Sequence, residues 1–338
     1  MQPTIALTIG DFNGIGPEVV LKSIRQIDRK RFHPLLIGNL SLFQYYNDLL
    51  KTGLSFFDAG PESEGAASSE SIPVLNLKYD SGQKLHPGVP TPASGSHSMK
   101  AVDKAIRLCL KKECQAMVTA PISKEAIHMA GFDLPGHTEY LARQTDASET
   151  LMILANRSLR VALSTGHIPL KEVPNQVRKE KLIRQIKHLN KSLIEDFGIA
   201  KPRIAILGLN PHAGDGGVLG REEIEEIKPA VSKVKERQQL KISGPLPADG
   251  FFGSGKWKNY DAVLAIYHDQ GLIPFKTLTF GKGVNFTAGL PIIRTSPDHG
   301  TAYDIAGKNQ ASEESMVMAI QLAIEIAERR YQPGHPVH

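Results

Sequence analysis

Residues 260–307 read YDAVLAIYHDQGLIPFKTLTFGKGVNFTAGLPIIRTSPDHGTAYDIAG, and this stretch decides the fold. Its apolar run from Ala262 to Ile266 has the length of a buried strand and ends in the polar turn signal His268-Asp269-Gln270-Gly271. Open α/β sheets bind their ligands at the carboxyl ends of the strands. We therefore predict a buried strand here, with an active site at its carboxyl end.

Short apolar runs recur along the rest of the chain and predict further strands. They lie at residues 4–9, 35–38, 116–119, 151–155, 159–164 and 204–208. Helical patterns separate them, at residues 17–27, 41–51, 102–110, 178–196, 221–238 and 313–330. This alternation predicts an α/β fold with a mainly parallel, doubly wound sheet. The segments 60–71 and 83–97 are rich in Gly, Pro or small polar residues, so we expect surface loops or extended chain there.

The composition is that of a globular protein. The chain has 338 residues, 41% of them hydrophobic and 22% charged, which is enough for two domains or one large α/β domain. Its formal net charge of +5 is spread along the chain, and no basic patch alternates with aromatic residues. This pattern suits a small anionic substrate and argues against a nucleic-acid partner.

The cysteines and the apolar runs bear on the compartment. Cys109 and Cys114 lie in a helical pattern at a spacing that corresponds to a rise of about 7.5 Å, which is too far for a disulfide. Two unpaired thiols without a signal-peptide pattern predict a cytoplasmic protein. No apolar run approaches the roughly 20 residues that cross a bilayer, so we expect no membrane partner.

Three predicted strands are each followed by a histidine that lies within three residues of a Gly or Pro. These histidines are His167, His212 and His268. One histidine in such a position is usually a packed core residue, whereas three in equivalent positions indicate a metal site, because imidazole is the commonest transition-metal ligand. Three protein ligands also leave a coordination position for substrate. Their wide spacing excludes a compact zinc finger, so the site would be assembled by the fold or across two subunits.

Other polar residues are candidates for binding an anion. Lys276, Asn285 and Arg294 could form a clamp, since lysine and arginine bind phosphate and carboxylate. His137 and Thr138, at a predicted helix N-terminus, could donate to the same anion. For each of them the ordinary alternative is a surface charge or a helix cap.

Two carboxylates are candidates for proton transfer or for support of a metal ligand. Asp249 ends the sequence GPLPAD, and Asp269 follows a candidate ligand directly.

The first predicted strand runs into a glycine-rich turn, Gly10 to Glu18, and Pro17 opens the helix that follows. Strand, glycine turn and helix is the general layout of a phosphate-cradling loop. The sequence GDFNGIGPE matches neither of the common phosphate-loop patterns. A tight turn that needs small residues is the alternative interpretation.

Together these motifs resemble a known family along nearly the whole chain. The matching runs are G-D-x-x-G-I-G-P-E, V-T-A-P-I-S-K, G-H-T-E-Y-L-A, S-T-G-H-I-P-L, N-P-H-A-G, G-P-L-P-A-D, Y-H-D-Q-G-L-I-P-F-K and G-V-N-F-T-A-G-L-P-I-I-R-T-S-P-D-H-G-T-A-Y-D-I-A-G. They resemble the 4-hydroxythreonine-4-phosphate dehydrogenase family of vitamin B6 biosynthesis. More distantly, G-I-G-P-E and H-G-T-A-Y-D-I-A-G are also similar to motifs of the isopropylmalate and isocitrate dehydrogenases.

The resemblance implies a three-layer α/β/α fold of two subdomains with a cleft, like that of isopropylmalate dehydrogenase. We expect subdomain 1, on the cofactor side, to comprise residues 1–135 and 275–338, and subdomain 2, on the metal and dimer side, to comprise residues 136–274. The resemblance also implies a homodimer with active sites shared between the subunits. One divalent metal, zinc foremost with magnesium or cobalt as alternatives, would be held by His167 and His212 of one subunit and His268 of the other.

The family's motifs also assign the remaining site residues. The substrate-binding positions match His137, Thr138, Lys276, Asn285 and Arg294, and Lys276, Asp249 and Asp269 are the catalytic candidates. By similarity to the distant relatives, NAD or NADP would be bound by Asp298, His299, Gly300, Thr301 and Asp304. The sequence departs from many family members at Phe12-Asn13, where Pro-Ala or Pro-Ser is common.

The implied activity is oxidation of 4-phosphooxy-L-threonine and decarboxylation of the resulting 3-oxo acid to 3-amino-2-oxopropyl phosphate. A metal that binds the alcohol oxygen, together with a cationic clamp for the phosphate, suits this chemistry. One alternative is a paralogue that oxidises 4-phosphothreonate, 4-phosphoerythronate or a dihydrodiol acid. A metal hydrolase or lyase with three histidines and no nicotinamide is a second alternative, and a non-enzymatic binding protein on the same fold is a third.

Overall fold

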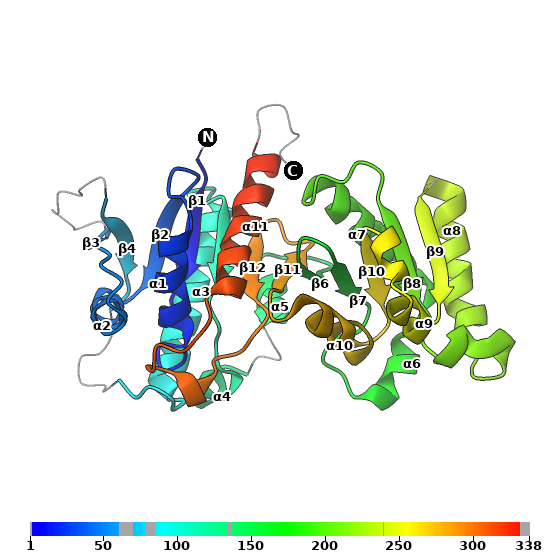
Figure 1. Cartoon of the computed structure of the whole chain (residues 1–338), viewed down its shortest axis with the longest axis horizontal. Helices are drawn as coiled ribbons and strands as arrows, with labels where there is room; N and C mark the ends of the chain where they lie inside the picture. Colours follow the sequence, from blue (N-terminus) through cyan, green and yellow to red (C-terminus); the bar gives the residue numbers. More distant parts are fainter. Residues whose placement is uncertain (1, 61–69, 79–84, 134–136, 239, 332–338) are drawn as a thin grey trace. The chain divides into compact units, whose positions relative to one another are not determined.

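The computed structural model describes residues 2–60, 70–78, 85–133, 137–238 and 240–331 (Figure 1). The chain divides into two compact units: unit 1 comprises Met1–Ser148 and Leu290–His338, and unit 2 comprises Glu149–Gly289. Each unit contains its own part of a β-sheet with helices around it. Among the described residues no helix is long and apolar enough to cross a bilayer.

The strands of unit 1 lie in the order β3-β4-β2-β1-β5-β12 and all pair in parallel. Their bounds are β1 Thr4–Thr8, β2 His33–Gly38, β3 Phe56–Asp58, β4 Ile72–Asn76, β5 Ala116–Thr119 and β12 Arg294–Pro297. The central strands β1 and β5 are almost wholly buried, as expected for a parallel sheet covered on both faces.

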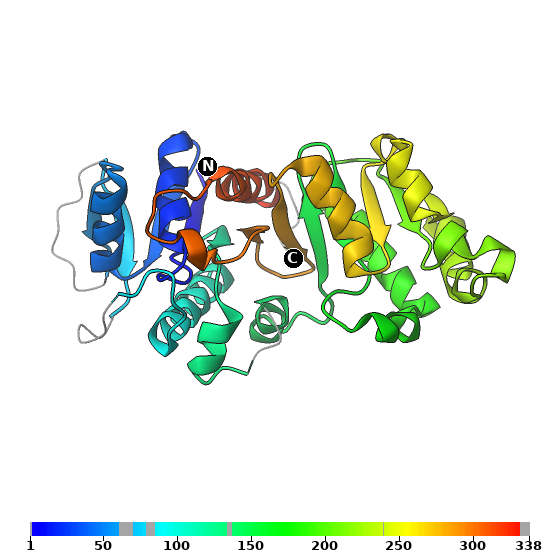
Figure 2. The ribbon, with the colours of Figure 1, turned by 60° about the horizontal axis from the view of Figure 1, so that its bottom comes forward.

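Helices cover both faces of this sheet. Their bounds are α1 Gly16–Gln26, α2 Leu40–Leu50, α3 Pro92–Leu110, α4 Lys124–Met129, α5 His137–Gln144 and α11 Glu314–Arg330, with a 3₁₀ turn at Tyr303–Ile305. α1 and α11 lie on one face and α3 on the other (Figures 1 and 2). The unit is therefore doubly wound, as the sequence predicts.

In unit 2 the strand order is β11-β6-β7-β10-β8-β9. Their bounds are β6 Leu151–Ala155, β7 Arg160–Leu163, β8 Arg203–Leu207, β9 Lys241–Leu246, β10 Ala262–Ala265 and β11 Val284–Ala288. β7, β10, β8 and β9 pair in parallel, whereas β6 pairs antiparallel with both β11 and β7. This arrangement confirms the predicted strand pair at 151–155 and 159–164 and the mainly parallel sheet.

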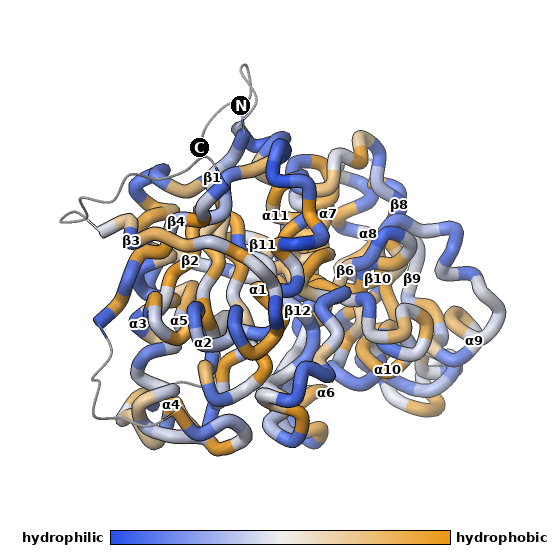
Figure 3. Tube along the Cα trace, turned by 60° about the vertical axis from the view of Figure 1, so that its left-hand side comes forward, coloured by the Kyte–Doolittle hydropathy of each residue, from blue (hydrophilic) through white to orange (hydrophobic). Residues whose placement is uncertain are grey.

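The helices of unit 2 enclose a core on its sheet. Their bounds are α6 Val173–Gln176, α7 Lys179–Glu195, a π-helical turn Glu223–Ile227, α8 Lys228–Gln238, α9 Ala248–Gly253 and α10 His268–Thr279, with 3₁₀ turns at Leu170–Glu172, Pro211–Gly217 and Lys256–Asn259. Alternate residues such as Val161, Leu163 and Val263 pack against Phe251 of α9 and Phe275 of α10. In both units the hydrophobic stretches of the chain concentrate in the interior, and hydrophilic ones follow the outer loops (Figure 3).

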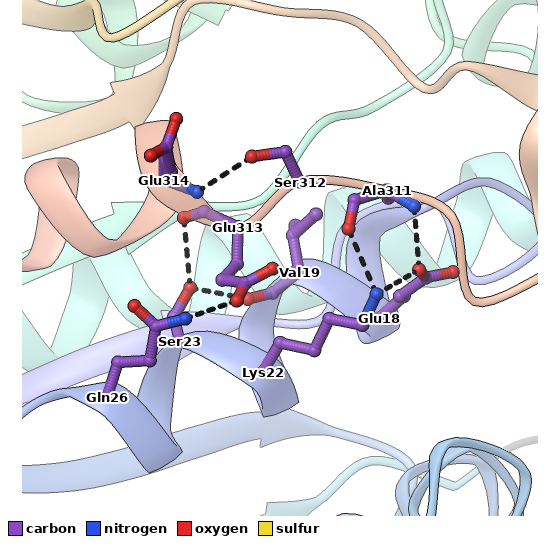
Figure 4. A network of polar contacts seen from close by, with 9 residues as sticks. All are labelled: Glu18, Val19, Lys22, Ser23, Gln26, Ala311, Ser312, Glu313 and Glu314. Atoms are coloured by element: carbon purple, nitrogen blue, oxygen red, sulfur yellow. Dashed lines mark hydrogen bonds and ion pairs between the residues drawn. The ribbon is translucent and has the colours of Figure 1, made fainter.

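Side chains of α1 anchor the segment that precedes α11 (Figure 4). Glu18 Oε1 is fully buried; it accepts from Lys22 Nζ at 2.7 Å and from the backbone N–H of Ala311 at 2.9 Å. Lys22 Nζ also donates to the Ala311 carbonyl at 3.0 Å, and Gln26 Nε2 donates to Glu313 Oε1. The glutamate of the GIGPE motif thus has a structural role, because it joins α1 to the segment that precedes the last helix.

The structure corrects two predicted elements. The segment 83–97 is not extended throughout, since α3 begins at Pro92 behind a capping box in which Thr91 Oγ1 accepts from Ser94 N and Ser94 Oγ accepts from Thr91 N. The polar sequence after β10 is the first turn of α10 and not a loop. Of the predicted loop 60–71, residues 61–69 lie outside the described residues.

The division into units also differs from the expected boundaries at 135 and 274. Residues 275–289 belong to unit 2, because β11 pairs with β6 and α10 packs on β7 and β10. The α5 helix belongs to unit 1, where Tyr140 Oη donates to Asp103 of α3 at 3.1 Å. As predicted, Cys109 and Cys114 are free thiols; both are buried, and burial raises the pKa of Cys114 to about 12.

Candidate active site

The three candidate metal ligands all follow strands of unit 2 at the carboxyl edge of its sheet. His167 comes after β7, His268 after β10 and His212 after β8, and these strands are neighbours in the order β7-β10-β8. The rings of His167 and His268 lie side by side, with centroids 5.6 Å apart and planes at 45°. No three His, Cys, Asp or Glu side chains converge as a metal site within the described residues, so His212 does not join this pair.

Asp269 orients one of these imidazoles. His268 Nδ1 lies 2.7 Å from Asp269 Oδ1, and the carboxylate is otherwise largely exposed. A carboxylate on one ring nitrogen leaves Nε2 available, which is the usual arrangement around a metal-ligating histidine. The donor set therefore fits a divalent transition metal. Asp249, the other catalytic candidate, is an exposed residue in the first turn of α9.

His212 begins an unusual backbone segment. Residues 212–216 all have positive φ, from 45° at Asp215 to 83° at Gly214. The left-handed region is unfavourable for residues with a Cβ, and such strain is found mostly at functional sites. His212 itself is exposed at the end of β8.

Arg294 is the most deeply buried of the anion-binding candidates. Its side chain is 1% exposed, and both Nε and Nη2 donate to Thr119 Oγ1, at 3.1 and 2.8 Å. Burial lowers the pKa of Arg294 to about 10. Because burial disfavours the charged guanidinium, an anion bound beside Arg294 would stabilise that charge.

Two further anion-binding candidates belong to unit 2. Asn285 lies on β11, where its Nδ2 faces Met152 Sδ at 3.5 Å and its Oδ1 is buried without a hydrogen bond among the described residues. Lys276 is exposed on α10. His137 and Thr138 are the first residues of α5, as predicted for a helix N-terminus, but their side chains lie outside the described residues.

The cofactor candidates form the loop that follows β12. Asp298 accepts at Oδ1 from Ser315 Oγ (3.3 Å), which in turn accepts from the Asp298 N–H (3.2 Å). Thr301 presents its carbonyl to Ile15 N at 2.9 Å. His299 has its Nδ1 3.1 Å from the Gly300 carbonyl, while its Nε2 is buried without a hydrogen bond among the described residues. Asp304 is exposed, and the space where Gly300 would carry a Cβ is open.

A buried carboxylate that is not among the predicted site residues supports this loop. Asp11 is fully buried and accepts at Oδ2 from Tyr303 Oη at 2.8 Å and from Ser94 Oγ at 3.0 Å, while Asn13 N donates to Oδ1 at 2.9 Å. Burial raises the pKa of Asp11, and these hydrogen bonds oppose the shift. Asp11 lies in the motif GDFNGIGPE and Tyr303 in the motif HGTAYDIAG. The motifs could therefore have indicated the two residues, but the sequence does not show that they form a pair.

The backbone N–H groups of the glycine-rich turn take part in contacts within the protein. The N–H groups of Asp11, Asn13, Gly14 and Ile15 all donate hydrogen bonds to oxygen atoms of the protein. The unusual Phe12-Asn13 pair is built into this turn: Phe12 is buried edge-on to His97, and Asn13 Nδ2 donates to Val89 O at 3.0 Å. These contacts are those expected of a tight turn.

Comparisons with known proteins agree with this architecture. The model of the family described as pyridoxal phosphate biosynthetic protein PdxA matches residues 30–323. A 4-hydroxythreonine-4-phosphate dehydrogenase of Prosthecochloris aestuarii is 47% identical over 335 residues, covering 97% of this chain and 98% of the relative. The crystal structure of the Klebsiella pneumoniae enzyme of that name superposes with a TM-score of 0.84 at 37% identity, covering 97% and 98% of the two chains.

A more distant structure is a terephthalate 1,2-cis-dihydrodiol dehydrogenase of Burkholderia xenovorans. It matches with a TM-score of 0.65 at 26% identity and covers 96% of this chain and 98% of that one. The comparisons confirm the family resemblance read from the sequence motifs. The chain belongs to the PdxA family of pyridoxal phosphate biosynthetic proteins.

Proposed function

We propose that this protein is an NAD(P)-linked, divalent-metal-dependent 4-hydroxythreonine-4-phosphate dehydrogenase. The observation that carries the proposal is the near full-length similarity, at 47% identity, to a relative of that name. The substrate would be 4-phosphooxy-L-threonine, oxidised to 2-amino-3-oxo-4-phosphooxybutanoate, which loses carbon dioxide to give 3-amino-2-oxopropyl phosphate for pyridoxal 5'-phosphate biosynthesis.

His167, His212 and His268 would hold the metal, with zinc preferred over magnesium or cobalt because all three donors are imidazoles. The 5.6 Å separation of the His167 and His268 rings supports assigning these two to one subunit. The other subunit of a homodimer would then supply His212, a different division from the one that the family resemblance implies. When bound, a divalent metal lowers the pKa of an alcohol and stabilises enolate charge as a Lewis acid.

The protein side chains would bind the substrate and move its protons. The phosphate and carboxylate groups would be held by Arg294, Lys276 and Asn285 together with His137 and Thr138. The buried cation of Arg294 supports this assignment, as does Asn285 Oδ1, which is buried without a hydrogen bond among the described residues. Lys276 and Asp249 would transfer protons to or from the reacting alcohol and enolate. Asp269 would keep His268 in the correct tautomer.

The nicotinamide cofactor would bind at residues 298–304. The open space at Gly300, and the His299 Nε2 that has no hydrogen bond within the described part of the chain, support a polar ligand beside this loop. Asp298, Thr301 and Asp304 would complete the site. We propose the cytoplasm as the compartment, in keeping with two free buried thiols.

The proposal is tested by following reduced-nicotinamide absorbance after adding 4-phosphooxy-L-threonine with NAD or NADP. We expect turnover that a chelator abolishes and that added zinc, magnesium or cobalt restores. Product formation without nicotinamide would instead indicate the hydrolase or lyase alternative. Metal and ligand binding without any product would indicate a binding protein.

The similarity to the dihydrodiol dehydrogenase, at 26% identity, supports dihydrodiol acids as an alternative substrate class. The same assay with 4-phosphothreonate, 4-phosphoerythronate and a dihydrodiol acid separates these possibilities. A kcat/KM at least about tenfold higher for one of these acids than for 4-phosphooxy-L-threonine would reassign the substrate.

A further inference from the structure

The loop that carries His212 adopts a backbone that its sequence does not favour. His212, Ala213 and Asp215 have φ values of 55°, 53° and 45°, and the intervening Gly214 and the following Gly216 are also left-handed. Three residues with a Cβ in a continuous left-handed turn persist only when surrounding contacts fix them. Something in the fold must therefore hold this turn.

Glu223 makes the contacts that hold it. The residue opens the π-helical turn before α8 and is 1% exposed. Its Oε1 accepts from the backbone N–H of Asn210 at 2.7 Å, and its Oε2 accepts from Asn210 Nδ2 at 3.0 Å. Both carboxylate oxygens thus bind Asn210, which lies two residues before the left-handed turn.

The glycines around the carboxylate show how tightly it is enclosed. A Cβ on Gly214 would lie 2.7 Å from Glu223 Oε2, and a Cβ on Gly208 would lie 3.1 Å from Glu223 Oε1. The carboxylate therefore fills the inside of the loop, between the end of β8 and the turn itself. Within the described residues no lysine, arginine or histidine forms an ion pair with Glu223, so its binding partners are the N–H groups of Asn210.

The π-helical geometry ties the same turn to a second element. Glu226, three residues after Glu223 in this turn, accepts from Lys179 N at the start of α7 at 2.5 Å. π-helical turns are rare in proteins, and many of those that do occur lie at functional sites. Glu223 is thus fixed between α7, α8 and the loop, and the loop is fixed through Glu223.

We infer that Glu223 is a positioning residue for the metal: it holds the left-handed loop that presents His212 at the carboxyl end of β8. This inference rests on the proposed metal site. It goes beyond that site, because Glu223 would contact neither the metal nor the substrate. Its carboxylate acts only through Asn210 and the backbone of residues 210–216.

The test is zinc affinity of the full-length protein, measured by competition with a chromophoric chelator. Glu223→Gln keeps the shape of the side chain but turns one acceptor into a donor that faces the Asn210 amide. We expect zinc binding to weaken about tenfold or more. With cobalt as the probe, the visible ligand-field bands should also change in intensity, which loss of stability alone would not cause.

Glu225→Gln is the matched control, since it removes the same charge from an exposed position in the same π-helical turn. It should bind zinc like the unmodified protein. Asn210→Ala is a milder variant that keeps the backbone N–H contact, and it should weaken zinc binding by a smaller factor. This variant decides the question if circular dichroism shows that Glu223→Gln does not fold.

His212→Ala separates the inference from the proposed metal site. If His212→Ala leaves zinc affinity unchanged, the proposed metal site is wrong. If His212→Ala weakens binding while folded Glu223→Gln and Asn210→Ala bind zinc with unchanged affinity and unchanged cobalt bands, the metal site stands and the role of Glu223 is refuted.

Discussion

Tyr303 shows how a single hydroxyl connects two motifs that are far apart in the sequence. It donates to the buried Asp11, whose carboxylate also receives Ser94 Oγ and Asn13 N. The hydrogen bond joins the turn before α1 to the loop proposed to bind the cofactor. Removing the hydroxyl leaves a buried carboxylate short of one donor, which is costly in a poorly solvated site.

Tyr303→Phe should therefore lower the free energy of unfolding by about 1–3 kcal/mol and raise the KM for nicotinamide cofactor. The KM for the phosphorylated substrate should change little, because Tyr303 is not among its proposed ligands. Urea denaturation and steady-state kinetics measure the two effects. Tyr45→Phe, at a residue that is 45% exposed, is the control and should change neither. An unaltered cofactor KM in Tyr303→Phe would separate this hydrogen bond from cofactor binding.

His97 makes stability depend on pH. It is buried against Phe12, and burial, aided by the charge of Lys100, lowers the pKa of His97 from 6.5 to about 4. Between these values the unfolded chain binds a proton that the folded protein excludes, so stability is lost as the pH falls through this window. Across the whole window the free energy of unfolding falls by about 3 kcal/mol.

His97→Met should remove this contribution. From about pH 7.5 to about pH 5 the variant should lose about 2 kcal/mol less stability than the unmodified protein. Urea unfolding at both pH values measures the difference. His128→Met, at an exposed position on α4, is the control and should keep the original pH dependence. Equal acid sensitivity in His97→Met would contradict the assignment.

At the scale of elements, the close approach of α3 and α4 depends on Gly95. A Cβ at this position would lie 2.0 Å from the carbonyl oxygen of Ala126. Because the obstacle is backbone, Gly95→Ala should move the two helices apart and cost about 3 kcal/mol of unfolding free energy. A shift of the urea midpoint measures the loss.

Gly250→Ala is the matched helical control. Gly250 lies in α9 with no atom within 4 Å of the position of a Cβ, so the substitution should raise stability by about 0.5–1 kcal/mol. Similar effects of the two substitutions would show that helix propensity, and not the contact with α4, determines the result.

The elements that could be predicted from the sequence are those with a local signal. The apolar runs became strands β1, β2, β5, β6, β7, β8 and β10. The first turn of α10 was mistaken for a loop because its residues are polar and include Gly271, which packs against Val161 and Leu163 of β7. The start of α3 was missed because Thr91-Pro92 reads as a turn until the capping box with Ser94 is considered.

The candidate site was predictable as a set of residue types but not as a geometry. Equivalent positions after three strands pointed to His167, His212 and His268, and two of these rings do meet. The contacts that position them, such as that of Glu223 with Asn210, join residues through a π-turn and a left-handed loop. Neither backbone state has a reliable signature in a single sequence.

At the scale of the whole molecule, unit 2 is continuous in sequence whereas unit 1 is made of two segments. A fragment of residues 149–289 contains a complete core, including Leu207, Val263 and Phe275. We expect this fragment to fold alone with a cooperative urea transition and native-like circular dichroism.

A fragment of residues 1–148 is the comparison. It lacks β12, which pairs with β5, and α11, whose buried face includes Ile320 and Ile324. We expect it to unfold without a cooperative transition, and to regain one when residues 290–338 are supplied as a second fragment. Cooperative folding of residues 1–148 alone would mean that β12 and α11 add little to unit 1.

The split of unit 1 has a consequence for the order in which the protein is made. When the ribosome has released the strands β1 to β5, their partner β12 has not yet been translated, and the intervening unit can already fold as it emerges. The nascent first half therefore waits with an unpaired strand edge and an uncovered apolar face. We expect molecular chaperones to engage the chain there, and premature termination near the end of the message to disable the beginning of the protein as well.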